Sequence, residues 1–401
     1  MTTITAILRD IFRKSEQERI FLVGGSVRDF LLEKKGADID LVAALPPDVI
    51  ESYGFHPVTG KSSVPIWFRH IKGIGKIEMV LLADSAELAG ELTRRDLTIN
   101  AMAMTLSGTI IDPLNGRQDL EQRLLRACSP STFTDDPLRL FRTFRFEAEG
   151  WRMTAGTEAL IRDQSWQQRL ATIPVERFTR EMLKALESAE PAQFFRLMLE
   201  FQAGDNYLPE IFRMPLIPAG PPEHHPEGDL FTHSTQVLEH VARQSPLPLS
   251  RFCAMFHDIG KLATSPEDYP RHHGHDEAGF GLARTFCTRL RLPATYRTAL
   301  AWVSRLHGKT NRWYELRDST KLKIAEQAIK AGIVDILPQV SMADKPDGVD
   351  LSSWAGVVRI AGLTTSELGI DPMQLGNVPP TSRPGYILQK RVEKLRGQRS
   401  Q

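Results

Sequence analysis

The stretch that most constrains the fold lies near the N-terminus, in the sequence FLVGGSVRDFLLEKKGADIDLV at residues 21–42. Its first three residues are apolar and predict a buried strand. Gly24 and Gly25 follow, and a backbone without Cβ atoms lets N–H groups approach an anion closely. Ser26 opens a predicted helix whose N-terminus favours a phosphate, with Arg28 close by. This segment therefore predicts a phosphate site.

Two aspartates lie at the end of the same stretch. Asp38 and Asp40 flank Ile39 on a second predicted strand, so the alternation of side chains puts both carboxylates on one face. Adjacent hard oxygen ligands suit Mg²⁺ bound jointly with substrate phosphates, as in two-metal phosphoryl transfer. A Gly-Gly pair alone is also typical of a turn, and an Asp-x-Asp alone is typical of a solvated strand edge.

Together, GGSVRD and ADIDLV resemble the active-site signature of the class II tRNA nucleotidyltransferases, the CCA-adding enzymes and their bacterial poly(A) polymerase relatives. The resemblance implies an α+β fold: a small nucleotidyltransferase head with a mixed β-sheet and helices, similar to polymerase beta, then an all-α neck and body. It also implies that Asp38 and Asp40 hold catalytic Mg²⁺ and that Gly25 and Arg28 bind the nucleotide triphosphate.

Chain length and charge limit the other possibilities. A chain of 401 residues exceeds the size of one growing core and predicts two to four domains. Its 50 basic and 49 acidic side chains nearly cancel, so binding to nucleic acid would need local basic patches. Three unpaired cysteines, no apolar leader and no apolar run long enough for a membrane span predict a cytoplasmic protein.

The rest of the head is predicted from periodicity. Apolar residues at helical spacing predict an amphipathic helix over 3–19, and two strands are predicted over 64–68 and 76–82. Glu78 lies on the second of these strands, where the family carries an acidic residue. It is a candidate third carboxylate, and its alternative interpretation is an exposed strand residue.

The connection after Glu78 is short. Most CCA-adding enzymes have a long flexible loop before the sequence RRD, whereas this chain passes from IEMVLL through ADSAELAGEL directly to TRRDLTINAMA. In this family, a shortened loop is associated with enzymes that add only the two cytidines. The resemblance therefore favours CC addition over complete CCA synthesis.

The TRRD stretch predicts a helix that opens with Thr93 as N-cap. Such a charged triplet is also typical of a solvated surface. By resemblance to the family, Arg95 would contact phosphate, Asp96 would contact the sugar hydroxyls, and Asn100 would support them. The following DPLNGRQDL, residues 112–120, matches a family motif interpreted as a scaffold between the head and the next helices.

Residues 133–146, FTDDPLRLFRTFRF, predict a helix whose first turn carries Pro137 behind two aspartates. The family's form here is Glu-Asp-x-x-Arg, in which Asp and Arg read the Watson–Crick edge of the incoming base. Asp136 and Arg139 occupy those positions, and Arg142 lies one turn further. An acceptor beside a fork of donors can match cytosine or, after re-orientation, adenine. Without the preceding motifs, this would read as an ordinary capped helix.

Residues 150–213 predict amphipathic helices, on which Arg177, Arg180 and Lys184 share one face and could meet tRNA phosphates. Surface helices often carry such charges without binding anything. The Pro- and Gly-rich segment 215–228 predicts a linker and the clearest domain boundary.

Histidines gather beyond this segment. His233, the pair His257-Asp258 and Asp344 follow the order H…HD…D, which resembles the HD superfamily of metal-dependent phosphohydrolases. The resemblance implies that these four residues bind a transition metal such as Ni²⁺, Mn²⁺ or Co²⁺. His273 or His275 could hold a second metal or handle a proton.

The predicted organisation is therefore a catalytic head (1–135), a helical neck with the base-recognition helix (136–214), a linker (215–228), an HD domain (229–349) and a helical tail (350–401). The predicted function is CMP addition to the tRNA 3′ end from CTP, with ATP as a further substrate for complete CCA, beside an HD phosphohydrolase activity. The alternatives are an HD hydrolase with an RNA-binding head, and a poly(A) polymerase. No oligomeric state is predicted.

Overall fold

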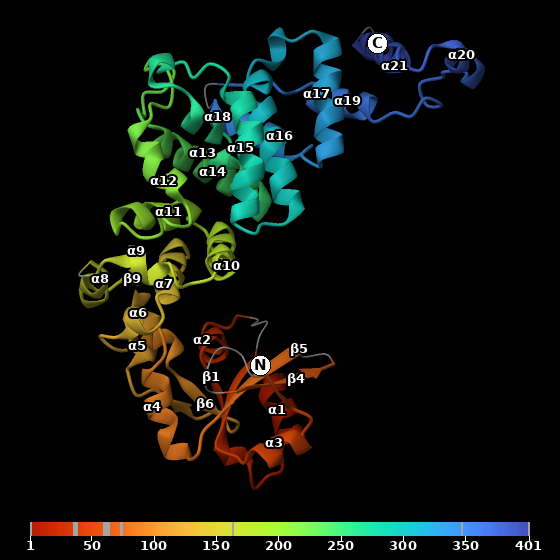
Figure 1. The fold of residues 1–401 in the computed structure, drawn as a ribbon. Coiled ribbons are helices and arrows are strands. Elements are labelled where there is room, and N and C mark those ends of the chain that lie inside the picture. The colour runs from red at the N-terminus through yellow and green to blue at the C-terminus, as the bar shows by residue number, and fades with distance from the viewer. Residues whose placement is uncertain are drawn as a thin grey trace. The chain divides into compact units, whose positions relative to one another are not determined.

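A computed structural model describes residues 2–34, 39–58, 65–72, 75–162, 164–345 and 348–399. The chain forms two compact units, Met1–Ser165 and Trp166–Gln401 (Figure 1). The first is called the N-terminal unit and the second the C-terminal unit, and each is described by itself. The five-part division expected from the sequence stays a prediction.

The N-terminal unit is built on a mixed seven-stranded sheet in the order β3-β4-β5-β2-β1-β6-β7. The strands are β1 Ile20–Val23, β2 Ile39–Ala43, β3 His56–Val58, β4 Ile66–Ile71, β5 Gly75–Leu81, β6 Ala103–Thr105 and β7 Ile110–Ile111. Strands β2 and β5 pair in parallel and all other neighbours are antiparallel. The predicted α+β head with a mixed sheet is confirmed.

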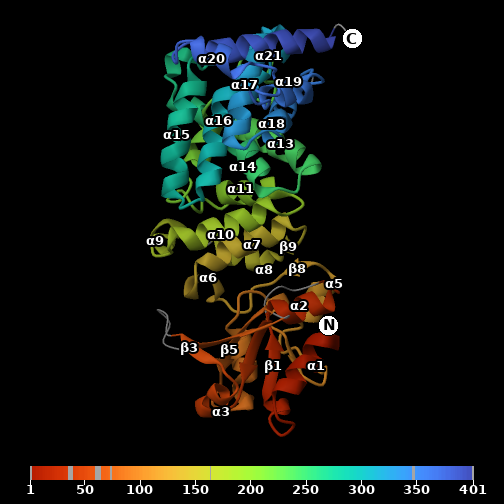
Figure 2. The same ribbon diagram turned by 90° about the vertical axis from the view of Figure 1, so that its right-hand side faces the viewer.

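Strand β1 lies in the interior of the sheet, between β2 and β6, and both of its faces are apolar. Ile20 and Leu22 belong to one core cluster, which also holds residues of α1 and α3, while Phe21 and Val23 belong to a second cluster with residues of α4. Helices therefore cover both faces of the sheet (Figures 1 and 2). The helices and remaining strands of this unit are α1 Thr2–Ile11, η1 Gln17–Arg19, α2 Gly25–Leu31, α3 Pro47–Ser52, η2 Ser85–Glu87, α4 Leu88–Thr93, η3 Thr98–Asn100, α5 Gly116–Glu121, β8 Leu124–Leu125, α6 Thr132–Asp135, α7 Leu138–Ala148, β9 Arg152–Met153 and α8 Ala155–Arg162.

Two predicted helices have different bounds. The N-terminal helix ends at Ile11, because the Gln17 side-chain amide donates to the carbonyls of Arg9 and Phe12 and so satisfies the end of the helix. Thr93 was wrong as an N-cap: it is the last residue of α4, and its hydroxyl donates to the Gly90 carbonyl. The strands expected over 64–68 and 76–82 are β4 and β5, and residue 64 lies outside the described residues.

The C-terminal unit is helical. Its helices are α9 Trp166–Leu170, α10 Val175–Leu186, α11 Pro191–Glu200, α12 Pro209–Arg213, η4 Met214–Leu216, α13 Leu230–Gln244, α14 Pro248–Phe256, η5 Ile259–Ala263, η6 Pro266–Asp268, α15 His275–Arg289, α16 Ala294–Thr310, η7 Trp313–Glu315, α17 Asp318–Ala331, α18 Ile336–Asp344, α19 Trp354–Ala361, α20 Pro372–Asn377 and α21 Arg383–Arg399. Among the described residues, no helix combines the length and apolar character that crossing a membrane requires.

The Pro-rich segment expected to be a linker is folded onto this unit. Pro218 pairs with Asp229 in an isolated bridge, and the Pro218 carbonyl accepts a hydrogen bond from His272 Nε2 at 2.7 Å. The next carbonyl, that of Ala219, accepts from the Lys261 ammonium at 2.5 Å. The segment therefore borders the histidine-rich region as part of the C-terminal unit.

Candidate nucleotide site and metal centre

Strand pairing places two carboxylate side chains of the head, those of Asp40 and Glu78, at opposing positions. In the parallel pair β2–β5, Asp40 lies directly opposite Glu78, so both side chains project from the same face of the sheet. The backbone N–H of Asp40 donates to the Ser26 hydroxyl at 3.1 Å, which joins β2 to the start of α2. The Asp40 carboxylate is an oxygen donor of the kind that Mg²⁺ prefers, whereas the Glu78 carboxylate pairs with Lys76 Nζ at 2.5 Å. Asp38, the other predicted ligand, lies outside the described residues.

Gly24, in the turn between β1 and α2, has a backbone conformation that favours glycine. Its φ is +67°, and a Cβ added there would lie 2.4 Å from Arg95 Nη1 and 3.7 Å from Asp40 Oδ2. A Cβ there would displace the Arg95 guanidinium, and the positive φ would strain any residue other than glycine. At Gly25, the glycine chosen from the sequence, the nearest atom to an added Cβ is Arg28 Nη2 at 3.6 Å, an ordinary contact.

Four of the predicted nucleotide-site residues form one chain of hydrogen bonds. Arg142 Nε donates to Asp96 Oδ2 at 2.7 Å, and Asn100 Nδ2 donates to Asp96 Oδ1 at 3.0 Å. Arg28 Nη1 then donates to Asn100 Oδ1 at 2.6 Å. We call Arg142, Asp96, Asn100 and Arg28 the relay. It connects α7 with α2, because Arg142 and Asp96 are 46 positions apart in the sequence and Arg28 and Asn100 are 72 positions apart.

Asp96 is the centre of the relay. It is buried, and Oδ1 accepts a further bond from the Leu97 N–H at 2.9 Å. Burial disfavours its charged form, but the Arg142 charge and the hydrogen bonds from Asn100 and Leu97 outweigh burial and hold the pKa of Asp96 well below its usual range. At neutral pH Asp96 is therefore an anion that orients Arg142 directly and Arg28 through Asn100, and its predicted contact with the sugar stays a prediction.

The predicted base-reading pair lies at the start of α7. Asp136 Oδ1 accepts from the Leu138 N–H at 3.1 Å and so caps the helix. The Arg139 guanidinium donates to the carbonyls of Arg94, at 2.6 Å, and Thr132, at 3.2 Å. These contacts hold Arg139 beside the segment that carries Arg94 and Arg95. Figure 1 shows that α6 and α7 are next to each other.

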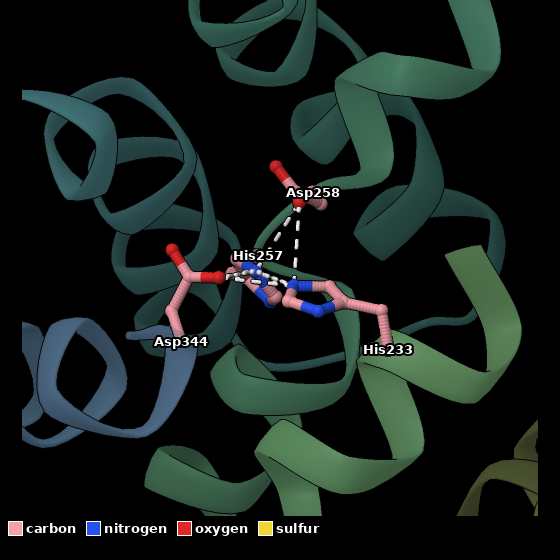
Figure 3. Close-up of side chains that lie close together, drawn as sticks. All are labelled: His233, His257, Asp258 and Asp344. Atoms are coloured by element: carbon pink, nitrogen blue, oxygen red, sulfur yellow. Dashed lines mark hydrogen bonds and ion pairs between the residues drawn. The ribbon is translucent and has the colours of Figure 1, made fainter. Parts of the chain in front are cut away.

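The four predicted HD ligands come together in the C-terminal unit (Figure 3). Their donor atoms lie within 4.8 Å of one another. His233 Nε2 lies 2.9 Å from Asp344 Oδ1 and 3.4 Å from His257 Nε2, and His257 Nε2 lies 3.4 Å from Asp258 Oδ2. His257 directly follows the last residue of α14, and Asp344 is the last residue of α18. Two imidazoles and two carboxylates in this arrangement fit a divalent transition metal.

Acceptors behind the imidazoles fix their tautomers. His257 Nδ1 lies 2.8 Å from the Ala254 carbonyl, which can only accept, so Nδ1 carries a hydrogen and Nε2 is the nitrogen that faces the cluster and could ligate an ion. His233 Nδ1 lies 2.7 Å from Glu227 Oε1, which has the same effect. A carboxylate that orients a ligand histidine is a common feature of metal sites.

A second group shares Asp258. His307 Nε2 lies 3.2 Å and His275 Nε2 3.5 Å from Asp258 Oδ1, while Oδ2 faces His257 and also pairs with Lys261 Nζ at 2.5 Å. The Nδ1 atoms of His307 and His275 face backbone carbonyls, at 3.0 and 2.8 Å. His275 was considered from the sequence as a second ligand or proton carrier, and the three described atoms could hold a cation.

Without a cation, the charges compensate one another by protonation. Burial lowers the basicity of His257, but Asp258 and Asp344 outweigh it and raise its pKa to about 10. Burial also opposes ionisation of Asp258 and Asp344. Lys261 and His257 nevertheless hold the pKa of Asp258 well below its usual range, and His233 and His257 do the same for Asp344. A bound divalent ion would take the place of these protons.

Sequence reasoning missed three residues of this centre: Glu227, Lys261 and His307. Glu227 lies in the segment predicted to be a linker, and its pKa is lowered to about 2 because hydrogen bonds from His233 and His225 outweigh burial. His307 is buried in α16. Lys261 could have been found from the HDIGK sequence, in which it follows the His-Asp pair, and Glu227 from its position beside His224 and His225. His307 is the single histidine of its helix, so no sequence pattern pointed to it.

A pocket of about 570 Å³ opens onto the cluster. Besides the ligands, its lining includes Gln236, His240, Lys261, Asn311 and Lys345. It combines cationic and hydrogen-bonding groups beside the carboxylates, which suits a phosphate-bearing ligand.

Together, the fold and these sites define a nucleotidyltransferase-type head joined to an HD-type metal centre. Three family models match the chain in agreement with this: the Poly A polymerase head domain at residues 68–126, the probable RNA and SrmB-binding site of polymerase A at 150–214, and the HD domain at 230–342.

Curated relatives match most of the chain. The Multifunctional CCA protein of Methylococcus capsulatus is 37% identical over 329 residues, covering 77% of this chain and 76% of the relative, and that of Thioalkalivibrio sulfidiphilus is 38% identical over 325 residues, covering 77% and 79%. The chain belongs to the family of multifunctional CCA proteins, a family of CCA-adding nucleotidyltransferases with an HD domain.

Solved structures show the same fold. The Thermotoga maritima CCA-adding enzyme complexed with tRNA matches with a TM-score of 0.65 at 20% identity, covering 94% of this chain and 87% of that one. The Bacillus stearothermophilus CCA-adding enzyme in complex with CTP matches with a TM-score of 0.62 at 22% identity, covering 94% and 89%.

Proposed function

We propose that this protein is a cytoplasmic, Mg²⁺-dependent nucleotidyltransferase that adds CMP from CTP to the 3′ end of tRNA without a nucleic-acid template. The observation that carries the proposal is the glycine turn: Arg95 and the Asp40 carboxylate lie beside Gly24, and Arg28 lies beside Gly25. The relay ties Arg28 to Arg142 through Asn100 and Asp96. Membership of the multifunctional CCA protein family supports tRNA as the acceptor.

Each side chain then has a role in positioning or charge neutralisation. Arg28 and Arg95 bind the triphosphate near the start of α2, and Asp136 and Arg139 read the edge of the base, with Arg142 beside them. Asp96 and Asn100 hold the arginines in place. Mg²⁺ held by Asp38 and Asp40 would neutralise charge on the reacting phosphates and activate the terminal hydroxyl.

The proposed product is the CC end. Strand β5 is connected to Arg95 only by η2 and α4, and this short ordered connection supports the interpretation of a shortened loop. The relatives' name, Multifunctional CCA protein, includes the terminal adenosine. The test must therefore compare the incorporation of AMP with the incorporation of CMP.

The test uses three tRNA transcripts, ending before the CCA, after CC, and after CCA, each offered labelled CTP or ATP. We expect CTP to extend the first transcript by two residues and ATP to extend none. Completion of the CC-ended transcript by ATP would contradict CC-only addition and show a CCA-adding enzyme. Repeated addition of AMP would favour the poly(A) polymerase alternative, and no incorporation at all would overturn the proposed transferase.

We also propose a phosphohydrolase activity in the C-terminal unit, on 2′,3′-cyclic phosphodiesters and 2′-nucleotides. The supporting observation is the convergence of His233, His257, Asp258 and Asp344 on one point beside a phosphate-suited pocket. Ni²⁺, Mn²⁺ or Co²⁺ held there would supply Lewis acidity for phosphoester hydrolysis. The His233 and His257 lone pairs would ligate the ion, while Lys261 orients Asp258.

Chelation separates the two activities. We expect a transition-metal chelator and His257→Ala to abolish phosphate release from a 2′-nucleotide while CTP incorporation with added Mg²⁺ continues. Phosphate release that persists in His257→Ala would contradict the assigned centre. Phosphate release without any incorporation by the intact protein would favour a hydrolase with an RNA-binding head.

A further inference from the structure

A second hollow of the C-terminal unit is lined by arginines and has no part in either proposed reaction. It is an open groove of about 890 Å³ between α10, α15 and α16, which lie together in Figures 1 and 2. Its lining consists of Val175, Gly281, Arg284, Thr285, Thr288, Arg289, Arg291 and Arg297. Four of these eight side chains are cationic and none is acidic.

An adjoining hollow of about 340 Å³ extends the positive surface. It shares Arg291 and adds Arg180 and Lys184 from α10, together with Glu176 and Glu187. The Thr179 hydroxyl of α10 donates to the Leu290 carbonyl, which fixes the helix against the segment joining α15 to α16. The basic groove is therefore defined by Arg180, Lys184, Arg284, Arg289, Arg291 and Arg297.

This concentration of charge departs from the composition of the chain. The whole protein carries 50 basic and 49 acidic residues, whereas the two hollows together are lined by six basic and two acidic side chains. Like charges gathered on one concave surface repel one another and attract an anionic partner.

The arginines differ in how they are held. Arg289 is fixed by Glu210, 2.5 Å away, and by the Tyr207 carbonyl, and Arg291 approaches Glu176 at 3.7 Å. Arg284 and Arg297 are exposed. The Arg284 carbonyl accepts from the Thr288 hydroxyl, but neither guanidinium forms a hydrogen bond or ion pair with another described residue. Their guanidinium forks are available for bidentate contact with phosphate oxygens.

We propose that the basic groove binds the phosphodiester backbone of RNA, and hence a part of the tRNA other than its reacting 3′ end. The groove is open and continues across two hollows, as an extended polymer requires, and its lining has no aromatic side chain to stack a free nucleotide's base. The groove would bind the charged backbone of the RNA independently of its base sequence. The inference rests on the proposed function, because it takes tRNA as the substrate.

The test compares the double variant Arg284→Ala/Arg297→Ala with a matched control, Arg243→Ala/Arg312→Ala. The control residues are also exposed arginines of the C-terminal unit and lie outside both hollows. Binding of a labelled tRNA transcript lacking its CCA end is titrated with the full chain at several salt concentrations. Losing two phosphate contacts should weaken binding about tenfold at low salt and reduce the slope of log K against log salt by about 1.5.

Wild-type affinity and salt slope in the groove variant would overturn the inference, as would an equal loss in the control variant. Hydrolysis of a small phosphoester by the C-terminal unit should stay unchanged in both variants, which verifies that they are folded. If the groove variant binds tRNA normally while the wild type incorporates CMP, only the groove assignment fails. If the wild type neither binds tRNA nor incorporates CMP, the proposed function fails.

Discussion

The relay through Asp96 makes the substitution Asp96→Asn a sharp test of the nucleotide site. An asparagine keeps the shape, and its Oδ1 can still accept from Leu97 and Asn100. Its amide group, however, would face Arg142 Nε, so a donor would meet a donor in place of the 2.7 Å charge-assisted bond. The variant therefore removes one strong interaction without opening a cavity.

The magnitude follows from the exposure of the two partners. A hydrogen bond to a charged group contributes about 1.5–3 kcal/mol. The Arg142 side chain is 37% exposed and can regain water, so we expect the lower part of that range, about 1.5–2 kcal/mol of unfolding free energy, measured by urea denaturation. Because Arg142 and, through Asn100, Arg28 lose their fixed positions, kcat/KM for CTP should fall at least about tenfold, with KM carrying most of the loss.

The effect of pH has a definite sign. The folded-state pKa of Asp96 is depressed below the model-compound value of 3.8, so its stabilising charge is present above about pH 4 and is lost as the pH falls below it. The stability of the wild type should decline more steeply in acid than that of Asp96→Asn.

Asp119→Asn is the matched control. Asp119 is buried in the same unit and accepts from Thr98 Oγ1 and from Arg126, but it contacts no predicted nucleotide-site residue. Both variants should lose stability, and only Asp96→Asn should lose kcat/KM at a temperature where both are folded. Equal kinetic losses in the two variants, or normal kinetics in Asp96→Asn, would refute the positioning role.

Three further expectations follow. Asp40→Ala should abolish CTP incorporation and leave the melting temperature and phosphate release unchanged, and near-normal incorporation would exclude Asp40 from catalysis. Glu227→Ala should weaken Ni²⁺ binding in equilibrium dialysis about ten- to a hundredfold by releasing His233, and an unchanged affinity would remove its orienting role. Because Asp258 and Asp344 raise the pKa of His257 to about 10, Ni²⁺ binding at pH 7 should release protons. The released protons are taken up by the buffer, so the binding enthalpy measured by calorimetry should depend on the buffer's ionisation enthalpy, and an enthalpy that is the same in all buffers would argue against proton release.

The parts of the head that could be predicted are those governed by local sequence. The apolar run before Gly24, the helix after it and the face shared by alternating strand residues depend on neighbouring residues only. Glu78 could not be placed opposite Asp40 from the sequence, because that placement depends on the register of β2 and β5, which are separated in the chain by two other strands, β3 and β4. The Asp96–Arg142 ion pair similarly joins positions 46 apart.

The errors also have local physical causes. Thr93 precedes an apolar pattern and so resembles an N-cap, but a threonine hydroxyl can equally donate to a carbonyl of the preceding turn, as it does to Gly90 at the end of α4. Segment 215–228 has the composition of a linker because proline prevents helix formation. Composition does not reveal that its free carbonyls, those of Pro218 and Ala219, serve as acceptors for buried side chains.

The distribution of the sites has a consequence for how the two chemistries are connected. Every described residue of the relay lies within residues 1–165, and every described ligand of the metal centre lies within 166–401, as does the basic groove. Neither set of donors needs a side chain from the other unit to complete it, so single substitutions should remove one activity at a time. A tRNA that engages the basic groove while its 3′ end is extended would be held by residues of the C-terminal unit, so the groove variants would lower CMP incorporation through KM for tRNA while leaving kcat intact.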